Sequence, residues 1–444
     1  MKTFLAINIG KFINKLSRLL GHEGSVTGGS IALRIDKNLF KNIKMPKYIL
    51  GITGSSGKSS TTELTYNILK NNKLSVAYNK SGSNAINGIA SLIIDNTNNK
   101  LEFNKDVLLM ELDEKYMQFI FKDFQLTHLV ITNVTRDQPP RNTHPEFIVN
   151  EIKKAINPKT KLILNADDPF VKTFGINHKG KVIYYALDKN NYSKKSNLNN
   201  IDAAYCPICN KKLIYDFYHY GHLGSYHCPN NDFERGKIDY LGTNINLNNQ
   251  TMMINNNLVH MPSNFLYSAY FVTASYALAS EIGINNKDII RSLNNKINTK
   301  RLNIYNFYGR KWQMLASKNE NNLSYKQSLD YIINSDEVKT IILGFNNSSR
   351  RYTENDISWI WDIDFEELND EKIDKILIIG RFRYDMLTRL MYAGINEAKI
   401  ILIDEINDIS EILKTKTIGT IYSMVCFDME IVLKDLIKKE NQKW

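Results

Sequence analysis

The chain has 444 residues, of which 43% are hydrophobic and 23% charged, so it can bury extensive cores and is not a disordered polymer. Its 57 Lys and Arg residues outnumber its 46 Asp and Glu residues, and the net charge of +11 favours anionic partners such as nucleotides or phosphorylated substrates. The sequence lacks an apolar run of about 18 residues, which excludes a transmembrane helix. Four Cys exclude a scaffold built on disulfide bonds.

The first twenty residues predict a helix, because apolar side chains recur at steps of three and four. This apolar stripe consists of Leu5, Ile9, Phe12, Leu16 and Leu19, and Lys11, Lys15 and Arg18 lie off it. The favoured interpretation is a helix that packs on its own domain. The alternative is a basic amphipathic helix that rests on an anionic membrane. We therefore assign residues 1–46 to an N-terminal amphipathic helical segment.

Residues 47–300 alternate short apolar runs with helical stretches, which predicts a doubly wound α/β domain around a parallel sheet. The expected strands are Tyr48–Ile52, Val107–Leu112, Leu129–Thr132 and Leu162–Leu164. A helix is expected at Ala269–Ile282. Residues 301–444 alternate in the same way and predict a second, C-terminal α/β domain.

A glycine- and serine-rich turn follows the first strand and opens a helix, which is the context that gives a phosphate-binding loop its meaning. The loop residues are Gly54, Ser55, Ser56, Gly57, Lys58, Ser59 and Ser60. Backbone N–H groups and the positive end of the helix would hold phosphate oxygens. Lys58 would reach the β- and γ-phosphates, and the Ser59 hydroxyl would bind Mg²⁺.

A cysteine cluster lies in an insertion at about residues 204–235. Cys206 and Cys209 form a C-x₂-C knuckle, and Cys228 follows 18 residues later. Structural zinc sites take four ligands, so this spacing predicts a zinc ribbon that needs one more. The alternative is a ribbon that has lost the metal and keeps its shape through the Tyr- and His-rich packing of Tyr215–Tyr226. The fourth ligand is left open among His227, His222, Asp232 and water.

The shortened loop G-x-x-G-K-S resembles that of the Mur ligases, the ATP-dependent enzymes that build peptidoglycan stem peptides. Further matches follow in the family's order at the ends of later strands: Glu111, Asn133, Asp137 and Asn165, and then Arg301 after the central domain. The resemblance implies a Mur ligase-like fold, ATP and Mg²⁺ as cofactors, and Glu111 as a Mg²⁺ ligand. It places Asn133, Asp137, Asn165 and Arg301 around the nucleotide.

Within this family, the cysteine insertion and the acidic, Trp-containing segment at 355–366 resemble the MurT subunits of lipid II isoglutaminyl synthases. That resemblance implies ATP-dependent amidation of the D-glutamate α-carboxylate in the lipid II stem peptide, with ammonia from a GatD-like glutaminase partner. It makes Asp356 the third member of the partner's catalytic triad. The implied location is cytoplasmic, at the inner face of the membrane.

The sequence departs from the family pattern at several positions, among them Pro139, Pro140 and Lys300. Ser268 and Phe271 stand where the family carries Asn residues that reach the adenine. This departure motivates an alternative: a MurT-like scaffold with reduced activity that activates a glutaminase without using ATP. A third hypothesis, a basic zinc-ribbon NTPase that acts on nucleic acid, would require salt-dependent binding to DNA or RNA.

Overall fold

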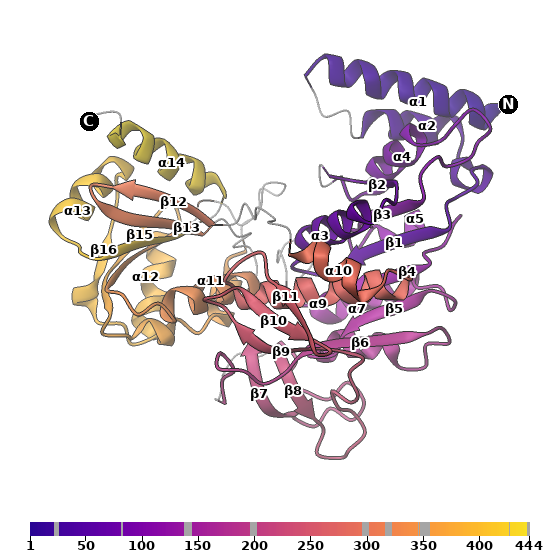
Figure 1. The fold of residues 1–444 in the computed structure, drawn as a ribbon. Helices are drawn as coiled ribbons and strands as arrows, with labels where there is room; N and C mark the ends of the chain where they lie inside the picture. Colours follow the sequence, from indigo (N-terminus) through magenta and orange to yellow (C-terminus); the bar gives the residue numbers. More distant parts are fainter. Residues whose placement is uncertain are drawn as a thin grey trace.

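The computed structural model describes residues 1–21, 26–80, 83–136, 144–195, 202–294, 302–315, 322–344, 346, 356–425 and 427–441. Two sheets organise this part of the chain, a nine-stranded sheet and a six-stranded sheet that lies on the C-terminal side of Figure 1. The predicted α/β class, with a central parallel sheet and a second α/β unit, is confirmed. The expected boundary between residues 300 and 301 falls outside the described residues.

The nine-stranded sheet has the order β11-β10-β9-β6-β5-β4-β1-β3-β2. Neighbouring strands run parallel from β2 through to β9, and β9, β10 and β11 form an antiparallel edge. The strands are β1 (Tyr48–Thr53), β2 (Val76–Tyr78), β3 (Val107–Glu111), β4 (His128–Ile131), β5 (Lys161–Asn165), β6 (Val182–Leu187), β9 (Tyr240–Asn246), β10 (Thr251–Ile254) and β11 (Asn257–His260). All four strands expected from the sequence are present in this sheet.

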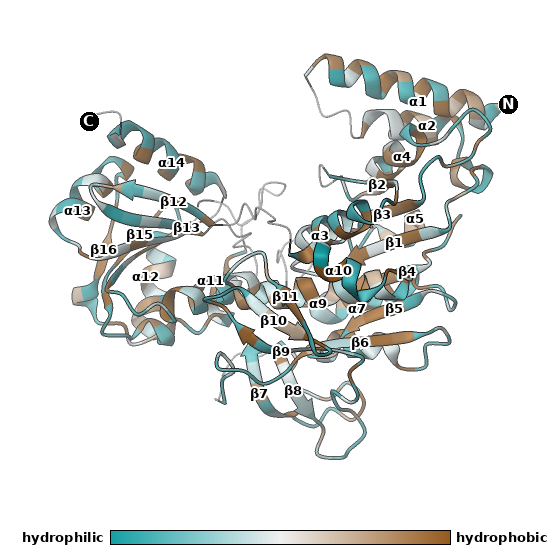
Figure 2. Cartoon of the chain, viewed as in Figure 1, coloured by the Kyte–Doolittle hydropathy of each residue, from teal (hydrophilic) through white to brown (hydrophobic). Residues whose placement is uncertain are grey.

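Both faces of the central sheet are buried under helices, which explains its nearly continuous apolar strands. Successive residues of β1 point to opposite faces, so Leu50 and Ile52 join one core and Ile49 joins the other. The first core lies under α3 (Lys58–Asn71), α9 (Leu266–Glu281) and α10 (Asn286–Leu293). The second lies under α2 (Thr27–Ile35), α4 (Ile86–Asp95), α5 (Met117–Ile120), α7 (Pro145–Ala155) and α8 (Pro169–Lys172). Figure 2 shows β5 and β6 as largely hydrophobic strands between these layers.

The N-terminal helix α1 (Lys2–Leu19) packs on α2 and α4 through a face that the sequence did not predict. Its buried residues are Thr3, Ala6, Ile7, Gly10 and Asn14. A Cβ atom on Gly10 would lie 2.4 Å from Ile94 Cδ1, so the close approach of α1 to α4 requires a small residue there. The favoured interpretation was right that the helix packs on its own domain, but wrong about the face, because the predicted apolar stripe points outward. None of the described helices is long and apolar enough to cross a membrane.

The six-stranded sheet has the order β12-β13-β17-β14-β15-β16, and it is parallel apart from the hairpin β12–β13. Its strands are β12 (Leu302–Phe307), β13 (Arg310–Leu315), β14 (Lys339–Gly344), β15 (Ile373–Ile379), β16 (Ile400–Leu402) and β17 (Thr420–Val425). Its helices are α11 (Asn322–Ile333), α12 (Arg383–Tyr392), α13 (Ile409–Thr415) and α14 (Phe427–Asn441). Short 3₁₀ helices complete the chain at Leu39–Asn42, Thr173–Gly175, Ser358–Asp362, Phe365–Leu368, Glu397–Lys399 and Ile406–Asp408.

The insertion between β6 and β9 contains the hairpin of β7 (Ile214–Tyr220) and β8 (Leu223–His227), which projects below the central sheet in Figure 1. The insertion has a small core of its own, made by Cys206, Leu213, Tyr226, Cys228 and Phe233. Two of the three clustered cysteines therefore lie in the core of the insertion.

Candidate active site

The predicted phosphate loop joins β1 to α3 at the carboxyl edge of the central sheet. Gly54 has a φ of +128°, and a Cβ there would lie 2.3 Å from Thr132 Oγ1. Gly57 has a φ of +85° at the N-cap of α3, and its Cβ would lie 2.5 Å from Phe271 Cε1. Only glycine fits both places. The strand–turn–helix context expected of the motif is therefore present, with the helix N-terminus directed at the loop.

Lys58 lies over this loop. Its ammonium group donates to the Gly54 carbonyl oxygen at 2.5 Å and forms an ion pair of 2.6 Å with Glu114 Oε1. Both side chains are largely buried, with 12% and 4% of their surfaces exposed. Glu114 was missed as a partner of Lys58, although its position just after the third strand was a signal. This pair holds a cation at the point where the motif predicts phosphate.

The predicted Mg²⁺ ligands Glu111 and Ser59 belong to neighbouring elements at the same edge. Glu111 ends β3 beside Ile52 of β1, and its backbone exchanges two hydrogen bonds of 2.9 Å with the Asn79 side chain. Ser59 is exposed in the first turn of α3. Carboxylate and hydroxyl oxygens suit Mg²⁺, so the residues present fit the ion.

Asn133 and Asn165 follow β4 and β5 and lie beneath the loop, as their positions at the strand ends predict. The Asn133 amide accepts from Ser56 N at 2.9 Å and donates to Ser56 O at 3.0 Å. Asn165 Nδ2 donates to the Thr132 carbonyl oxygen at 2.9 Å. Both amides therefore hold backbone in place around the loop. Asp137 and Arg301 lie outside the described residues.

Two of the positions that depart from the family pattern, Ser268 and Phe271, belong to α9, which packs on the helix that follows the loop. Ser268 Oγ donates to the carbonyl oxygens of Ser263 and Phe265 at 2.9 and 2.6 Å. Phe271 is buried against Gly57, and its ring centroid is 5.2 Å from that of Tyr267. Neither residue presents an amide to a nucleotide base. Tyr267 also lines a cavity of about 250 Å³ between α9 and the C-terminal sheet.

The C-terminal domain contacts the loop directly, which the sequence did not indicate. Ser324 of α11 lies 3.2 Å from Ser56, measured between their hydroxyl oxygens. Arg136, just after β4, forms an ion pair of 2.8 Å with Asp362 and donates to Ser358 Oγ at 2.5 Å. These contacts fix the relative position of the two domains around the loop.

Asp356 lies at the start of this interdomain contact. Its Oδ1 accepts hydrogen bonds from the Ser358 N–H at 2.9 Å and the Ser358 hydroxyl at 2.5 Å. Nearby, Trp359 is buried, whereas Trp361 is 42% exposed and packs on exposed Tyr392 with ring centroids 5.6 Å apart. Asp356 therefore caps a turn next to an exposed aromatic pair, and its role in a partner's triad stays a prediction.

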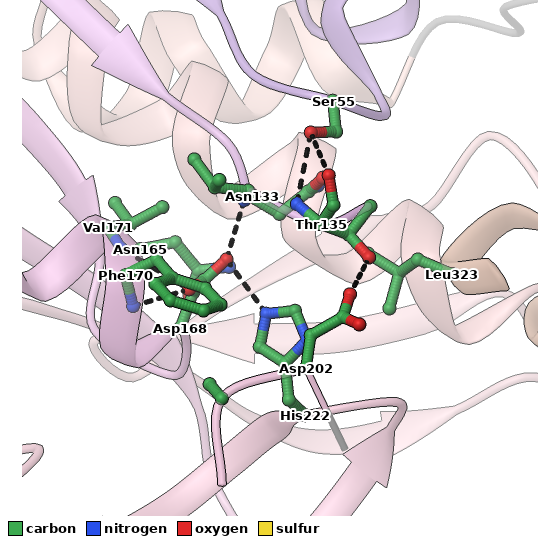
Figure 3. Close-up of polar contacts among 12 residues, drawn as sticks. Ser55, Asn133, Thr135, Asn165, Asp168, Phe170, Val171, Asp202, His222 and Leu323 are labelled. Atoms are coloured by element: carbon green, nitrogen blue, oxygen red, sulfur yellow. Dashed lines mark hydrogen bonds and ion pairs between the residues drawn. The ribbon is translucent and has the colours of Figure 1, made fainter. Parts of the chain in front are cut away.

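A buried ion pair ties the insertion hairpin to the end of β4 (Figure 3). His222 Nε2 lies 3.2 Å from Asp168 Oδ2, and this oxygen also accepts from the Val134 N–H at 2.7 Å. The next residue, Thr135, is bonded to the phosphate loop, because its N–H donates to Ser55 Oγ at 3.0 Å. His222 thus pairs with Asp168 and does not belong to the cysteine cluster.

We expect His222→Gln to destabilise the protein mainly at low pH. Burial on its own lowers the pKa of His222, but the Asp168 and Asp202 carboxylates together outweigh burial and raise this pKa above its ordinary value. The ion pair is therefore fully present below about pH 6.5 and is lost as the pH rises through the raised pKa. Chemical denaturation should show that the free energy of unfolding of His222→Gln is about 2 kcal/mol lower than that of the wild type at low pH. This difference should become smaller at higher pH.

The exposed histidine His260 in β11 provides the matched control, and His260→Gln should change stability little at any pH. A difference between the wild type and His222→Gln that stays constant with pH, or that widens as pH rises, would contradict this account.

The cysteine cluster brings four ligand atoms together. The sulfurs of Cys206, Cys209 and Cys228 and a carboxylate oxygen of Asp232 all lie within 4.8 Å of one another. Cys209 Sγ and Cys228 Sγ are 3.4 Å apart, which is too long for a disulfide bond. Backbone N–H groups of Ile208 and Asn230 donate to Cys206 and Cys228 at 3.4 Å each. Three thiolates and one carboxylate can hold a metal ion, and His227 instead lies 3.6 Å from Asp216.

Comparison with known proteins places this geometry in a family. Residues 52–226 match the family model of the Mur ligase middle domain, and residues 318–427 match that of the MurT ligase C-terminal domain. The MurT subunit of lipid II isoglutaminyl synthase from Staphylococcus aureus is 29% identical over 89% of each chain. The chain is a MurT-like protein.

Two further comparisons extend to nearly the whole MurT-like chain. The MurT subunit of lipid II isoglutaminyl synthase from Streptococcus pneumoniae is 26% identical over 99% of each chain. A pseudomurein peptide ligase type C from Methanothermus fervidus has a TM-score of 0.67 at 20% identity, covering 90% of this chain and 81% of its own. The fold is therefore that of Mur ligases, as predicted.

Proposed function

We propose that the MurT-like chain is the ligase subunit of a glutamine-dependent enzyme that amidates lipid II in peptidoglycan synthesis. The observation that carries the proposal is the intact phosphate loop, with Lys58 held over it, in a chain similar to MurT subunits along most of its length. The substrates are ATP, a D-glutamate α-carboxylate in the lipid-linked stem peptide, and ammonia.

In the proposed reaction the γ-phosphoryl group passes from ATP to a carboxylate oxygen, and ADP leaves. The nitrogen of ammonia then bonds to the acyl carbon, the bond from that carbon to the phosphate oxygen breaks, and D-isoglutamine forms. The loop N–H groups from Gly54 to Ser60 bind the phosphates, and Lys58 neutralises the charge that develops on the transferred group. Mg²⁺ held by Ser59 and Glu111 would supply further neutralisation.

The ammonia comes from a GatD-like glutaminase partner in this proposal. Asp356 would hydrogen-bond the partner's catalytic imidazole and fix its tautomer. The exposed pair Trp361 and Tyr392 supports a docking surface near Asp356, because exposed aromatic side chains are frequent anchors of protein interfaces.

The scaffold alternative draws on Ser268 and Phe271, which offer no amide to an adenine. The cavity beside Tyr267 weighs against it, since its aromatic rings can stack on a base. We place the base in that cavity, with the phosphates at the loop.

The test is an assay of the purified chain with a glutaminase partner, lipid II, ATP and glutamine, followed by mass spectrometry of the stem peptide. We expect glutamine-dependent amidation and stoichiometric release of ADP. Glutamine hydrolysis without amidation or ATP turnover would instead support the scaffold alternative.

We also propose that the cysteine cluster holds a structural zinc ion with Asp232 as its fourth ligand. Zinc takes four ligands in a tetrahedron with Zn–S distances of about 2.3 Å, which puts neighbouring sulfurs about 3.8 Å apart. The 3.4 Å between Cys209 and Cys228 is close to that spacing. Asp232 completes the set, because its Oδ1 lies 3.3 Å from Cys206 Sγ.

The purified chain should therefore contain about one zinc ion, measured by elemental analysis. Cys228→Ser should remove most of the zinc and lower the melting temperature, because metal binding stabilises the folded insertion. Asp232→Asn should weaken zinc binding, whereas Asp216→Asn, at an exposed carboxylate of the same insertion, should not. Zinc content unchanged in Cys228→Ser would contradict the assignment.

A further inference from the structure

Helix α1 exposes a broad apolar face on the outside of the molecule. The exposed fractions of Leu5, Phe12, Leu16 and Leu19 are 54, 67, 46 and 76%. Figure 1 shows α1 as the outermost helix of its end of the molecule, beyond α2 and α4. Soluble proteins seldom expose a row of large apolar side chains, and such a row marks an interaction surface.

These residues form one continuous face. At 3.6 residues per turn, positions 5, 12, 16 and 19 project in nearly the same direction. The opposite direction belongs to Ala6, Gly10 and Asn14, which are buried against α2 and α4. Apart from Ile7, the buried face is thus made of small or polar residues, whereas Leu5, Phe12, Leu16 and Leu19 of this 18-residue helix, about 27 Å long, face outward.

The charged side chains of α1 itself are all of one sign. Lys2 and Lys15 are exposed on opposite edges of the apolar face. Arg18 is half exposed and forms an ion pair with Asp95 of α4. The helix itself contains no Asp or Glu, and the whole chain carries a net charge of +11.

We propose that the exposed face of α1 docks the chain onto the surface of an anionic lipid bilayer. A helix with Leu and Phe on one face and Lys at its edges lies in the interface plane, with the apolar side chains among the acyl chains and the ammonium groups among the headgroups. The charge complementarity selects anionic lipid over a second copy of this basic chain. This inference does not depend on the amidation reaction, and it would bring the protein to any lipid-linked substrate.

The proposal is tested by co-sedimentation of the full chain with vesicles of phosphatidylglycerol and phosphatidylcholine, or of phosphatidylcholine alone. We expect binding to the anionic vesicles, weakened by high salt. Phe12→Glu should weaken this binding roughly tenfold to a hundredfold, because it removes one large apolar anchor and adds a repelled charge. Lys15→Glu should weaken binding to anionic vesicles only.

The matched control is Ile431→Glu, which changes a residue that is 62% exposed on α14 of the C-terminal domain. It should leave vesicle binding unchanged. Three results would overturn the proposal: no binding of the wild type to anionic vesicles, equal binding of the wild type and Phe12→Glu, or a wild-type dimer in light scattering that Phe12→Glu converts to a monomer. The last result would assign the face to a second copy of the chain.

Discussion

Lys58→Ala is expected to lower the rate of ATP-dependent amidation by a factor of about 100 to 1,000, while the chain stays folded. Lys58 is the cation placed over the loop, 2.5 Å from the Gly54 carbonyl oxygen. Removing a preorganised group that stabilises transition-state charge typically costs this much. The measurement is the initial rate of ADP release in the presence of lipid II and ammonium, with circular dichroism as the check on folding.

Lys70→Ala is the matched control, because Lys70 is an exposed lysine on the same helix. It should leave the rate unchanged. If Lys58→Ala retains the wild-type rate, Lys58 does not act on the transferred phosphoryl group, and the ion pair with Glu114 is then its structural role.

The second large effect is expected at Asp356, and it should depend on whether glutamine or ammonium supplies the nitrogen. Asp356→Asn should lower glutamine-dependent amidation by a factor of about 1,000 to 10,000, since an asparagine cannot stabilise a partner's imidazolium. The same variant should keep the wild-type rate when ammonium chloride replaces glutamine, because the ligase site is untouched. The assay compares the two nitrogen sources with one preparation of the complex.

Asp385→Asn changes an exposed carboxylate of α12 and should alter neither rate. An equal loss of rate with both nitrogen sources would show that Asp356 acts only by capping the turn at Ser358 and so by fixing the position of the C-terminal domain. That result would remove Asp356 from the partner's catalytic triad.

The sequence was sufficient to predict the sheet and the loop. Local features define them: short apolar runs such as Val107–Leu112, followed by polar turn residues, are typical of buried strands, and the glycines at 54 and 57 mark a turn that other residues cannot adopt. The carboxyl ends of parallel strands meet at one edge, so Glu111, Asn133 and Asn165 come together without knowledge of the tertiary structure.

The orientation of α1 could not be predicted in the same way. Hydrophobic spacing identifies the apolar face of a helix, and Leu5, Phe12, Leu16 and Leu19 do lie on one face. The contact between α1 and α4 depends on close approach at Gly10, which is a property of two helices and leaves no periodic signal. The apolar stripe therefore predicted amphipathicity correctly and the buried face wrongly.

Pairs that join distant parts of the chain were also invisible. Arg136 meets Asp362 and His222 meets Asp168, each through tertiary contacts that no motif spacing encodes. The fourth ligand of the cysteine cluster was open for the same reason. Asp232 follows Cys228 by four residues, and only the fold of the insertion shows that its carboxylate reaches the sulfurs.

The central claim is that the loop from Gly54 to Ser60 directs the γ-phosphoryl group of ATP onto the substrate carboxylate. Lipid II labelled with ¹⁸O in the D-glutamate α-carboxylate tests it most directly, in a single turnover with ATP and ammonium. The account predicts that one labelled oxygen appears in the released phosphate, together with the amide. Phosphate without label, or amide formed without ADP, would contradict it.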